Sequence, residues 1–285
     1  MKKIFIRIIN AICVAFQVIK SLCAILVFSQ ISGRKNIRTS DNTICNVLGN
    51  GPSLAENINI IKDAPYPSIA VNFLCKSEYF RIIKPSYYLF IDSSFLNGAD
   101  EKCANMRVDF CNCVRNIDWQ MTLFLPFHQR KSIGAEMISK INNDFLKIKY
   151  INTTPIDGPI GFRNFLYKSN LGMPLAYNVI NAALMVGINL GFKELHLFGA
   201  EHSFLQQLCF DEEGNLCGYN SHVYKDEFQK YYKIPRGGLE DGLYSFAKCL
   251  TSYRYISDYA KYCNTKIFNR CKDSFIESFD KKFSY

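Results

Sequence analysis

The sequence predicts an α/β protein built around a parallel sheet, on two observations. First, short continuous apolar runs recur along the chain and most end at a polar residue, as in parallel strands buried on both faces. Second, the run at residues 43–48 (TICNVL) leads into the turn 49–53 (GNGPS) and then a helical pattern over 54–62. A strand, a glycine-rich turn and a helix start open a nucleotide-binding βαβ unit. We therefore expect a single Rossmann-like domain.

The remaining elements follow in order from the same kind of pattern. Further strands are expected at 68–73, 87–91, 122–126, 194–198 and 266–269, and helices at 176–190, 242–263 and 274–283. Residues 203–240 are rich in glycine, tyrosine and charge and show little periodicity, which is typical of a functional lid or a disordered segment. We place a flexible lid there, within one domain that spans 41–285.

Residues 1–40 form a separate basic arm. They hold seven of the 34 Lys and Arg residues and no acid, so the rest of the chain carries 27 bases against 25 acids. A nearly neutral body argues against a nucleic-acid partner. Within the arm, residues 4–31 are mostly apolar, and a helix would gather their polar members in one stripe: Arg7, Asn10, Gln17, Lys20 and Ser21. These charges interrupt the run before it reaches the roughly 20 apolar residues of a spanning helix.

The arm is therefore predicted to be an N-terminal amphipathic helix on an anionic membrane surface. A secretory signal and a helix packed on the protein's own core are the alternatives. The 12 cysteines include no CxxC pair, which indicates free thiols in a reducing cytosol rather than an exported protein. Cys111 and Cys113 form a lone CxC without a second pair, so we expect no metal site there.

Polar and small residues at the strand ends form the predicted nucleotide site. Gly49 and Gly51 let the backbone approach a phosphate or sugar, and Ser53 can cap the following helix. Because ligands of parallel sheets lie at the carboxyl ends of the strands, further side chains from those ends should converge there. The expected members are Asn50, Asn72, Asp92 and Ser93.

Four segments resemble one enzyme family. Residues 46–54 (NVLGNGPSL) are similar to the opening motif of the bacterial sialyltransferases of glycosyltransferase family 42, and Asn72 stands where that family has an asparagine. Residues 182–199 and 256–279 resemble the family's apolar helix with its strand and its terminal helix, strand and C-x-x-S loop. The likeness covers roughly 44–280. The GNGPSL piece also occurs in a wider group, which includes proteins like the archaeal 6-hydroxymethylpterin diphosphokinase.

The resemblance implies a metal-independent, inverting glycosyltransferase that needs no cofactor. Its donor would be a CMP-linked nonulosonic acid, and its acceptor a glycan or glycolipid of the bacterial surface, such as lipopolysaccharide or capsule. With the arm, this implies a peripheral enzyme on the cytoplasmic face of the inner membrane. By the same likeness Asn50 and Asn72 hold the nucleotide, and Ser274 of the C-x-x-S loop belongs to the site. Asp92 departs from the family's asparagine, which puts the identity of the donor in question.

The catalytic residues come from the lid. The resemblance implies that His222, in the segment 220–222 (NSH), is the general base, and that Tyr219 and Tyr224 stand in for the family's phosphate-binding tyrosines. The family's second histidine is missing. Reasoning from the residues alone, His202 at a strand end is a second candidate base, with Glu201 beside it as a rival.

The other candidate side chains have more ordinary explanations. His196 lies inside a strand and is expected to be packed in the core, His128 sits near a strand end, and Arg236 could pair with a phosphate or be a solvated loop charge.

Two other functions stay open. One is pyrophosphate transfer in the manner of the pterin diphosphokinase group, which would need a magnesium site of clustered acids, with Asp92 as the strand-end candidate. The other is a Rossmann-like binding or assembly protein that has lost catalysis. The sequence also leaves a homo-oligomer open.

Overall fold

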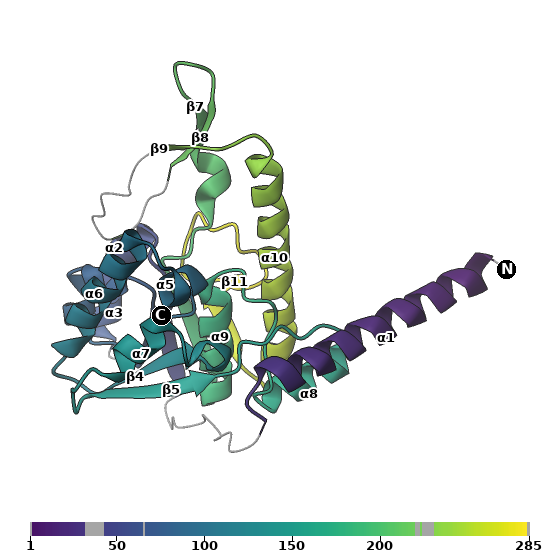
Figure 1. Cartoon of the computed structure of the whole chain (residues 1–285), viewed down its shortest axis with the longest axis horizontal. Coiled ribbons are helices and arrows are strands. Elements are labelled where there is room, and N and C mark those ends of the chain that lie inside the picture. The colour runs from purple at the N-terminus through teal and green to yellow at the C-terminus, as the bar shows by residue number, and fades with distance from the viewer. Residues whose placement is uncertain (1, 32–42, 65, 220–222, 224–230, 284–285) are drawn as a thin grey trace.

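A computed structural model describes residues 2–31, 43–64, 66–219, 223 and 231–283. It confirms the predicted α/β domain with a parallel sheet, from which one long helix extends (Figure 1). The helices, including 3-10 turns marked η, are α1 (Lys2–Phe28), α2 (Ser53–Glu56), α3 (Ile58–Asp63), η1 (Leu74–Lys76), α4 (Tyr79–Ile83), α5 (Ser93–Asn97), α6 (Glu101–Arg115), η2 (Phe127–Gln129), α7 (Ile133–Ser139), α8 (Ile160–Lys168), α9 (Val179–Leu190), η3 (Ser203–Gln207) and α10 (Gly238–Tyr262).

The strands form two sheets. Their bounds are β1 (Ile44–Leu48), β2 (Ser68–Val71), β3 (Tyr87–Leu89), β4 (Met121–Pro126), β5 (Leu146–Ile151), β6 (Glu194–Phe198), β7 (Leu208–Phe210), β8 (Leu216–Tyr219), β9 (Tyr231–Lys233), β10 (Lys266–Asn269) and β11 (Asp280–Lys281). The main sheet has the order β11-β10-β6-β1-β2-β3-β4-β5, and its strand pairs are all parallel. The chain therefore builds outward from β1 to β5 and then returns to the other side of β1, which makes the β1–β6 boundary a topological switch point.

Alternation along the central strands divides the core into two layers. Cys45 and Val47 of β1 belong to a cluster with α9 and α10, whereas Leu48 belongs to a cluster with α2 to α7 on the opposite face. All three side chains are fully buried. Because both faces are covered, these strands read as continuous apolar runs, which is why the sequence revealed them.

Most of the described part of the arm, residues 2–31, is one helix, α1, and only the last part of this helix contacts the domain. Every described side chain from residue 3 to residue 16 is exposed, whereas Ser21, Ile25 and Ser29 are buried. Ser21 and Ser29 make hydrogen bonds to the body, to the carbonyl oxygens of Asp157 (2.9 Å) and Leu171 (2.7 Å). Part of the predicted polar stripe thus docks the helix onto the protein itself.

By length and composition, α1 could cross a membrane. The segment Lys3–Phe28 reaches a mean hydropathy of 2.3 over its most apolar window, of which 11% is buried. We expected Arg7 and Lys20 to interrupt the apolar run. The helix continues through both residues, because the long aliphatic stems of Arg and Lys can lie along apolar surface.

Some predicted elements differ from the observed ones. The helix expected at 54–62 is split at Asn57, whose side chain donates to the Ser53 carbonyl oxygen at 2.8 Å. Residues 203–240 hold a 3-10 turn and the antiparallel sheet β7-β8-β9, whose strands are too short to give a periodic signal. The helix expected at 274–283 is wrong: the segment is irregular with bends, and its residues 280–281 form strand β11 beside β10.

Candidate functional site

Two glycines bring the ends of β1 and β6 into backbone contact at the switch point. The Gly49 N–H donates to the Phe198 carbonyl oxygen (2.8 Å), and the Gly51 N–H donates to that of Gly199 (2.9 Å). A Cβ at Gly49 would lie 2.1 Å from the Gly199 oxygen, and Gly199 has a φ of +62°. The predicted need for glycine at position 49 is real, but its cause is the neighbouring strand end.

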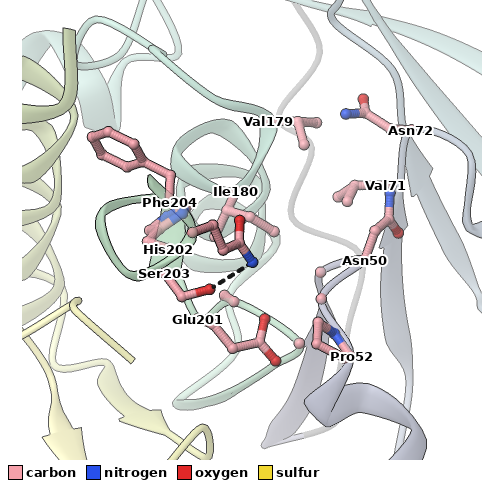
Figure 2. Close-up of a pocket in the computed structure, with 15 residues that line it drawn as sticks. Asn50, Pro52, Val71, Asn72, Val179, Ile180, Glu201, His202, Ser203 and Phe204 are labelled. Carbon is pink, nitrogen blue, oxygen red and sulfur yellow. Dashed lines mark hydrogen bonds between the residues drawn. The ribbon is translucent and has the colours of Figure 1, made fainter. Parts of the chain in front are cut away.

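A cavity of about 240 Å³ opens beside this contact, at the carboxyl edge of the sheet. Figure 2 shows Asn50, Val71 and Asn72 on one side of it and His202, Ser203 and Phe204 on the other. The loops after β1, β2 and β6 and the start of α9 contribute its walls. This is the position at which open parallel sheets bind ligands. The remaining lining residues are Gly49, Gly51, Pro52, Val179, Ile180, Gly199, Ala200, Glu201 and Gln207.

Asn50 and Asn72 carry polar atoms without a partner at the cavity. The side-chain Oδ1 of each is buried and accepts no hydrogen bond within the described part of the chain. Asn72 also has a left-handed backbone, with φ 48°, which asparagine tolerates better than most residues. The Tyr88 hydroxyl fixes that conformation by donating to the Asn72 carbonyl oxygen at 2.6 Å. Buried unpaired acceptors are costly, so these two oxygens are suited to a ligand that donates hydrogen bonds.

Glu201 adds a carboxylate to the same edge. Its Oε1 accepts from the Ser53 N–H at 2.7 Å, and a Cβ at Gly51 would lie 1.5 Å from its Oε2. Gly51 thus leaves room for the carboxylate in this position, and a side chain at 51 would displace it. Ser53, which we expected to cap the following helix, makes no side-chain cap hydrogen bond, and its N–H is bound by this carboxylate instead. The cavity edge thus presents three acceptor groups, from Asn50, Asn72 and Glu201.

A buried hydrogen-bond network holds the ring of His202. Its Nε2 lies 2.6 Å from the Tyr253 hydroxyl and 3.2 Å from Nδ2 of Asn178. The Asn178 Oδ1 accepts from the Asn181 N–H at 3.0 Å, which caps α9 and fixes the orientation of the amide. The Asn178 amide nitrogen also donates to Cys249 Sγ (2.9 Å) and to the Tyr253 hydroxyl (3.1 Å), and that hydroxyl lies 3.2 Å from Asn178 Oδ1. Two groups that can donate thus lie at Nε2, which favours a neutral imidazole with its proton on Nδ1.

Burial keeps His202 neutral. It lowers the pKa of His202 from 6.5 to about 4, because the charged imidazolium loses its hydration in this environment. At neutral pH the side chain is therefore uncharged and a weak proton acceptor. This describes a binding or orienting group better than a general base.

Other predicted site residues lie around the cavity without lining it. Ser274 is buried and donates to the Ala200 carbonyl oxygen at 2.7 Å, so it supports the loop that carries Glu201 and His202. Asp92 caps α5, accepting from the Ser94 N–H at 2.8 Å, and Asp92 and Ser93 are exposed. Asp92, where the resembled family has asparagine, is therefore a helix N-cap, a position at which aspartate and asparagine are equally favourable.

The lid residues are only partly described. Tyr219 ends β8 and does not line the cavity, whereas His222 and Tyr224 lie outside the described residues. Val223, which the structure does describe, donates its N–H to the carbonyl oxygen of Asn50 at 2.7 Å. The chain at position 223 is thus in direct contact with the turn that borders the cavity.

Three further candidates lie outside this cavity. His196 is buried as expected, contacts Glu194, and receives a hydrogen bond from Arg270. His128 lies at the far edge of the sheet, 6.3 Å from the ring of Phe28, and Arg236 is exposed. Among the residues that the structure describes, no group of three or more His, Cys, Asp or Glu side chains is placed to hold a metal ion. The 12 cysteines, which all fall within the described ranges, are free thiols.

Sequence reasoning missed the support behind His202. Asn178, Cys249 and Tyr253 come from α9 and α10, and Tyr253 is fully buried in an otherwise apolar cluster. The signal that could have found Asn178 is the Asn178-x-x-Asn181 spacing, a capping box directly before an apolar helix. Phe204 and Gln207 lie in the segment that we treated as an aperiodic lid, where no pattern marks single residues.

The fold resembles solved glycosyltransferases at low sequence identity. MAf glycosyltransferase from Magnetospirillum magneticum AMB-1 matches with a TM-score of 0.50 and 14% identity over 95% of this chain, which spans 38% of that protein's chain. Sialyltransferase CstII from Campylobacter jejuni, in complex with a substrate analogue, cytidine-5'-monophosphate, gives 0.47 and 14% over 85% of this chain and 86% of its own. The α-2,3-sialyltransferase Cst-I from the same organism gives 0.43 and 13% over 90% and 87%.

No protein-family model and no curated protein sequence matches the chain. The likeness to MAf glycosyltransferase shows a shared α/β fold, which agrees with the fold that the sequence motifs implied.

Proposed function

We propose that this protein is a metal-independent glycosyltransferase that takes a nonulosonic acid from a CMP-linked donor. The observation that carries the proposal is the edge of acceptor groups formed by Asn50, Asn72 and Glu201 at the switch point of a parallel sheet. Ribose hydroxyls and the amino group of cytosine are hydrogen-bond donors that match these acceptors. The shared fold with MAf glycosyltransferase supports the reaction class, and the GNGPSL resemblance supports the CMP donor.

The position of Glu201 favours a nucleoside over a phosphate at this edge. A carboxylate next to Gly51 repels a phosphate that approaches the turn 49–53, whereas it accepts readily from a sugar hydroxyl. The donor is therefore proposed to place its nucleoside against Asn50, Asn72 and Glu201. The phosphate and sugar of the CMP-linked substrate then extend toward His202, whose ring N–H can donate a hydrogen bond to one of their oxygens.

The general base is proposed to be His222. The contact of Val223 with Asn50 supports this assignment, because Val223 directly follows His222 in the chain and lies at the border of the cavity. An inverting transfer needs a base that removes the proton of the acceptor hydroxyl, and histidine is the residue type whose unperturbed pKa, about 6.5, suits that role at neutral pH. His202 is less suitable because burial lowers its pKa to about 4.

The protein is proposed to act on a surface glycan or glycolipid acceptor at the cytoplasmic face of the inner membrane, attached through α1. The exposed apolar surface of α1 and its basic residues Lys3, Arg7 and Lys20 support membrane attachment. A lipid-linked acceptor is then available at the same surface.

Nucleotide binding and transfer can be tested separately. Isothermal titration with CMP, UDP, GDP and ATP is expected to give the tightest binding for CMP. Asn50→Ala and Asn72→Gly should each weaken that binding about tenfold, the usual effect of losing one hydrogen bond to a ligand. Glycine is chosen at 72 because the φ of 48° would strain an alanine. Asp92→Asn keeps a capping side chain and reports whether Asp92 contributes to binding.

Transfer is then measured as CMP release from a CMP-linked nonulosonic acid in the presence of a lipid-linked glycan. Stronger binding of another nucleotide would reject the proposed donor. Tight CMP binding without transfer to any tested acceptor would favour the binding or assembly protein that has lost catalysis.

A further inference from the structure

Helix α8 is fixed to the inner part of α1. The Ser21 hydroxyl and the backbone of Asp157, three residues before α8, exchange hydrogen bonds of 2.9 Å. Ile25 of α1 and Leu166 of α8 belong to the same buried cluster. In Figure 1, α8 lies alongside the part of α1 nearest the body. A surface that receives this inner part of α1 therefore meets α8 as well.

The outward face of α8 carries large apolar side chains. Ile160 is 53% exposed and Phe165 is 64% exposed, although Leu166 and Tyr167 on the inward face are buried. Lys168, at the end of this face, is exposed, and its Nζ lies 5.4 Å from the centre of the Tyr262 ring. Apolar side chains bordered by a lysine and an exposed tyrosine are typical of the interface region of a bilayer.

The geometry of α1 brings this face to the bilayer. The part of α1 in which every side chain is exposed, residues 3–16, is roughly 21 Å long at 1.5 Å per residue. That is shorter than the hydrocarbon core of a bilayer, about 30 Å. To span the core, the helix must also insert its docked part, where Ile19, Leu22 and Leu26 are exposed. To lie flat in the interface, it must place the same part at the headgroups. In both cases α8 reaches the lipid.

We propose that the outward face of α8, formed by Ile160, Phe165 and Lys168, is a second lipid-contacting surface. It inserts into the interface of an anionic bilayer beside α1 and thereby fixes the orientation of the domain on the membrane. The proposal rests on the membrane attachment proposed above, because without that attachment the outward face of α8 would have no lipid to contact.

A tryptophan placed on α8 tests the contact directly. The full chain with Phe165→Trp is mixed with anionic vesicles that contain brominated lipids, and its fluorescence is compared with that of the unsubstituted chain, which contributes only Trp119. Vesicle binding is followed independently by flotation. The matched control is Val108→Trp on α6, which replaces a side chain that is 45% exposed in the opposite layer.

We expect bromine quenching and a blue shift for Phe165→Trp and neither change for Val108→Trp. The double variant Ile160→Ser/Phe165→Ser should partition into vesicles about tenfold more weakly than the unsubstituted chain. The reason is that it loses two apolar side chains that would be partly buried in the lipid.

Each contrary outcome has a distinct meaning. If the chain floats with the vesicles but Phe165→Trp is not quenched, the proposed role of α8 is overturned while membrane attachment stands. If the chain does not float, both proposals fail. If the Phe165→Trp fluorescence is shielded in lipid-free buffer by self-association of the chain, the face contacts a second copy and the lipid assignment is rejected.

Discussion

The Tyr253 hydroxyl lies 2.6 Å from Nε2 of His202, and this contact, together with Nδ2 of Asn178, determines what the histidine can do. Both neighbours can donate to the same nitrogen, which favours a ring proton on Nδ1. The histidine next to the cavity is thereby prepared to donate a hydrogen bond and poorly prepared to remove a proton.

The tautomer of His202 can be observed by NMR. The chain has four histidines, so ¹⁵N-histidine labelling gives few signals, and the one lost in His202→Gln identifies the residue. We expect the proton on Nδ1, and we expect Tyr253→Phe to reduce this preference because one donor to Nε2 is removed. A proton found on Nε2 in the unsubstituted chain would contradict the network.

His202 should also make stability depend on pH. Its pKa falls from 6.5 to about 4 on folding, so the unfolded chain binds more protons than the folded chain between these values. The free energy of unfolding should therefore decrease as the pH is lowered from 6.5 toward 4, by at most about 3 kcal/mol from this residue. Urea unfolding at a series of pH values measures the effect, and His202→Gln, which does not titrate, should show a flatter dependence.

The proposed base, His222, gives a kinetic prediction. Loss of a general base typically costs 10²–10⁴ in rate, so His222→Ala should lower turnover by about that factor and leave CMP affinity nearly unchanged. His202→Ala is the matched control and should act mainly on donor binding. An inactive His202→Ala beside an active His222→Ala would move the base to the end of β6 and reject the assignment carried over from the family.

The contact between Gly49 and Gly199 gives a stability prediction. Gly49→Ala places a methyl group 2.1 Å from the Gly199 oxygen, so β1 and β6 must separate at their carboxyl ends. We expect a loss of about 1–3 kcal/mol in the free energy of unfolding, with weaker nucleotide binding. Gly242→Ala is the control, since nothing lies within 4 Å of its added Cβ and helix α10 should gain up to about 1 kcal/mol. Equal stability of the two variants would show that the close approach is not needed.

Removal of divalent metals with EDTA is expected to leave transfer activity unchanged. The chain has no DxD motif, and the proposed chemistry needs no metal to bind the donor. Activity is measured before and after chelation and again after addition of magnesium or manganese. Full loss with rescue by either ion would favour the pyrophosphate-transfer alternative.

Residues 1–35 fused to a soluble reporter should sediment with anionic vesicles, because α1 combines an apolar surface with basic residues. Added salt should weaken the binding by screening the basic residues. Neutral vesicles are the control. A reporter that stays in the supernatant at low salt would remove the basis for membrane attachment.

The strands and the turn at the cavity could be predicted because their signals are local. The strand at 43–48 and the turn 49–53 are consecutive, and a strand buried on both faces must be a continuous apolar run. The positions of Asn50 and Asn72 then follow from the rule that ligands lie where parallel strands end. The segments at 203–240 and 274–283 were not predictable in this way, because very short strands take their form from their partners.

Tertiary structure decided the chemistry of the site. Glu201 reaches the Ser53 N–H across 148 residues, and this pairing adds a carboxylate to the turn that we expected to approach a phosphate or sugar. His202 acquires its hydrogen-bond partners from Asn178 and Tyr253, which only the packing of α9 and α10 brings to it. The sequence by itself determined which residues stand at strand ends, because strands are set by local pattern. Which of them face one another depends on the strand order and on long-range packing, and no local segment of the sequence determines either one.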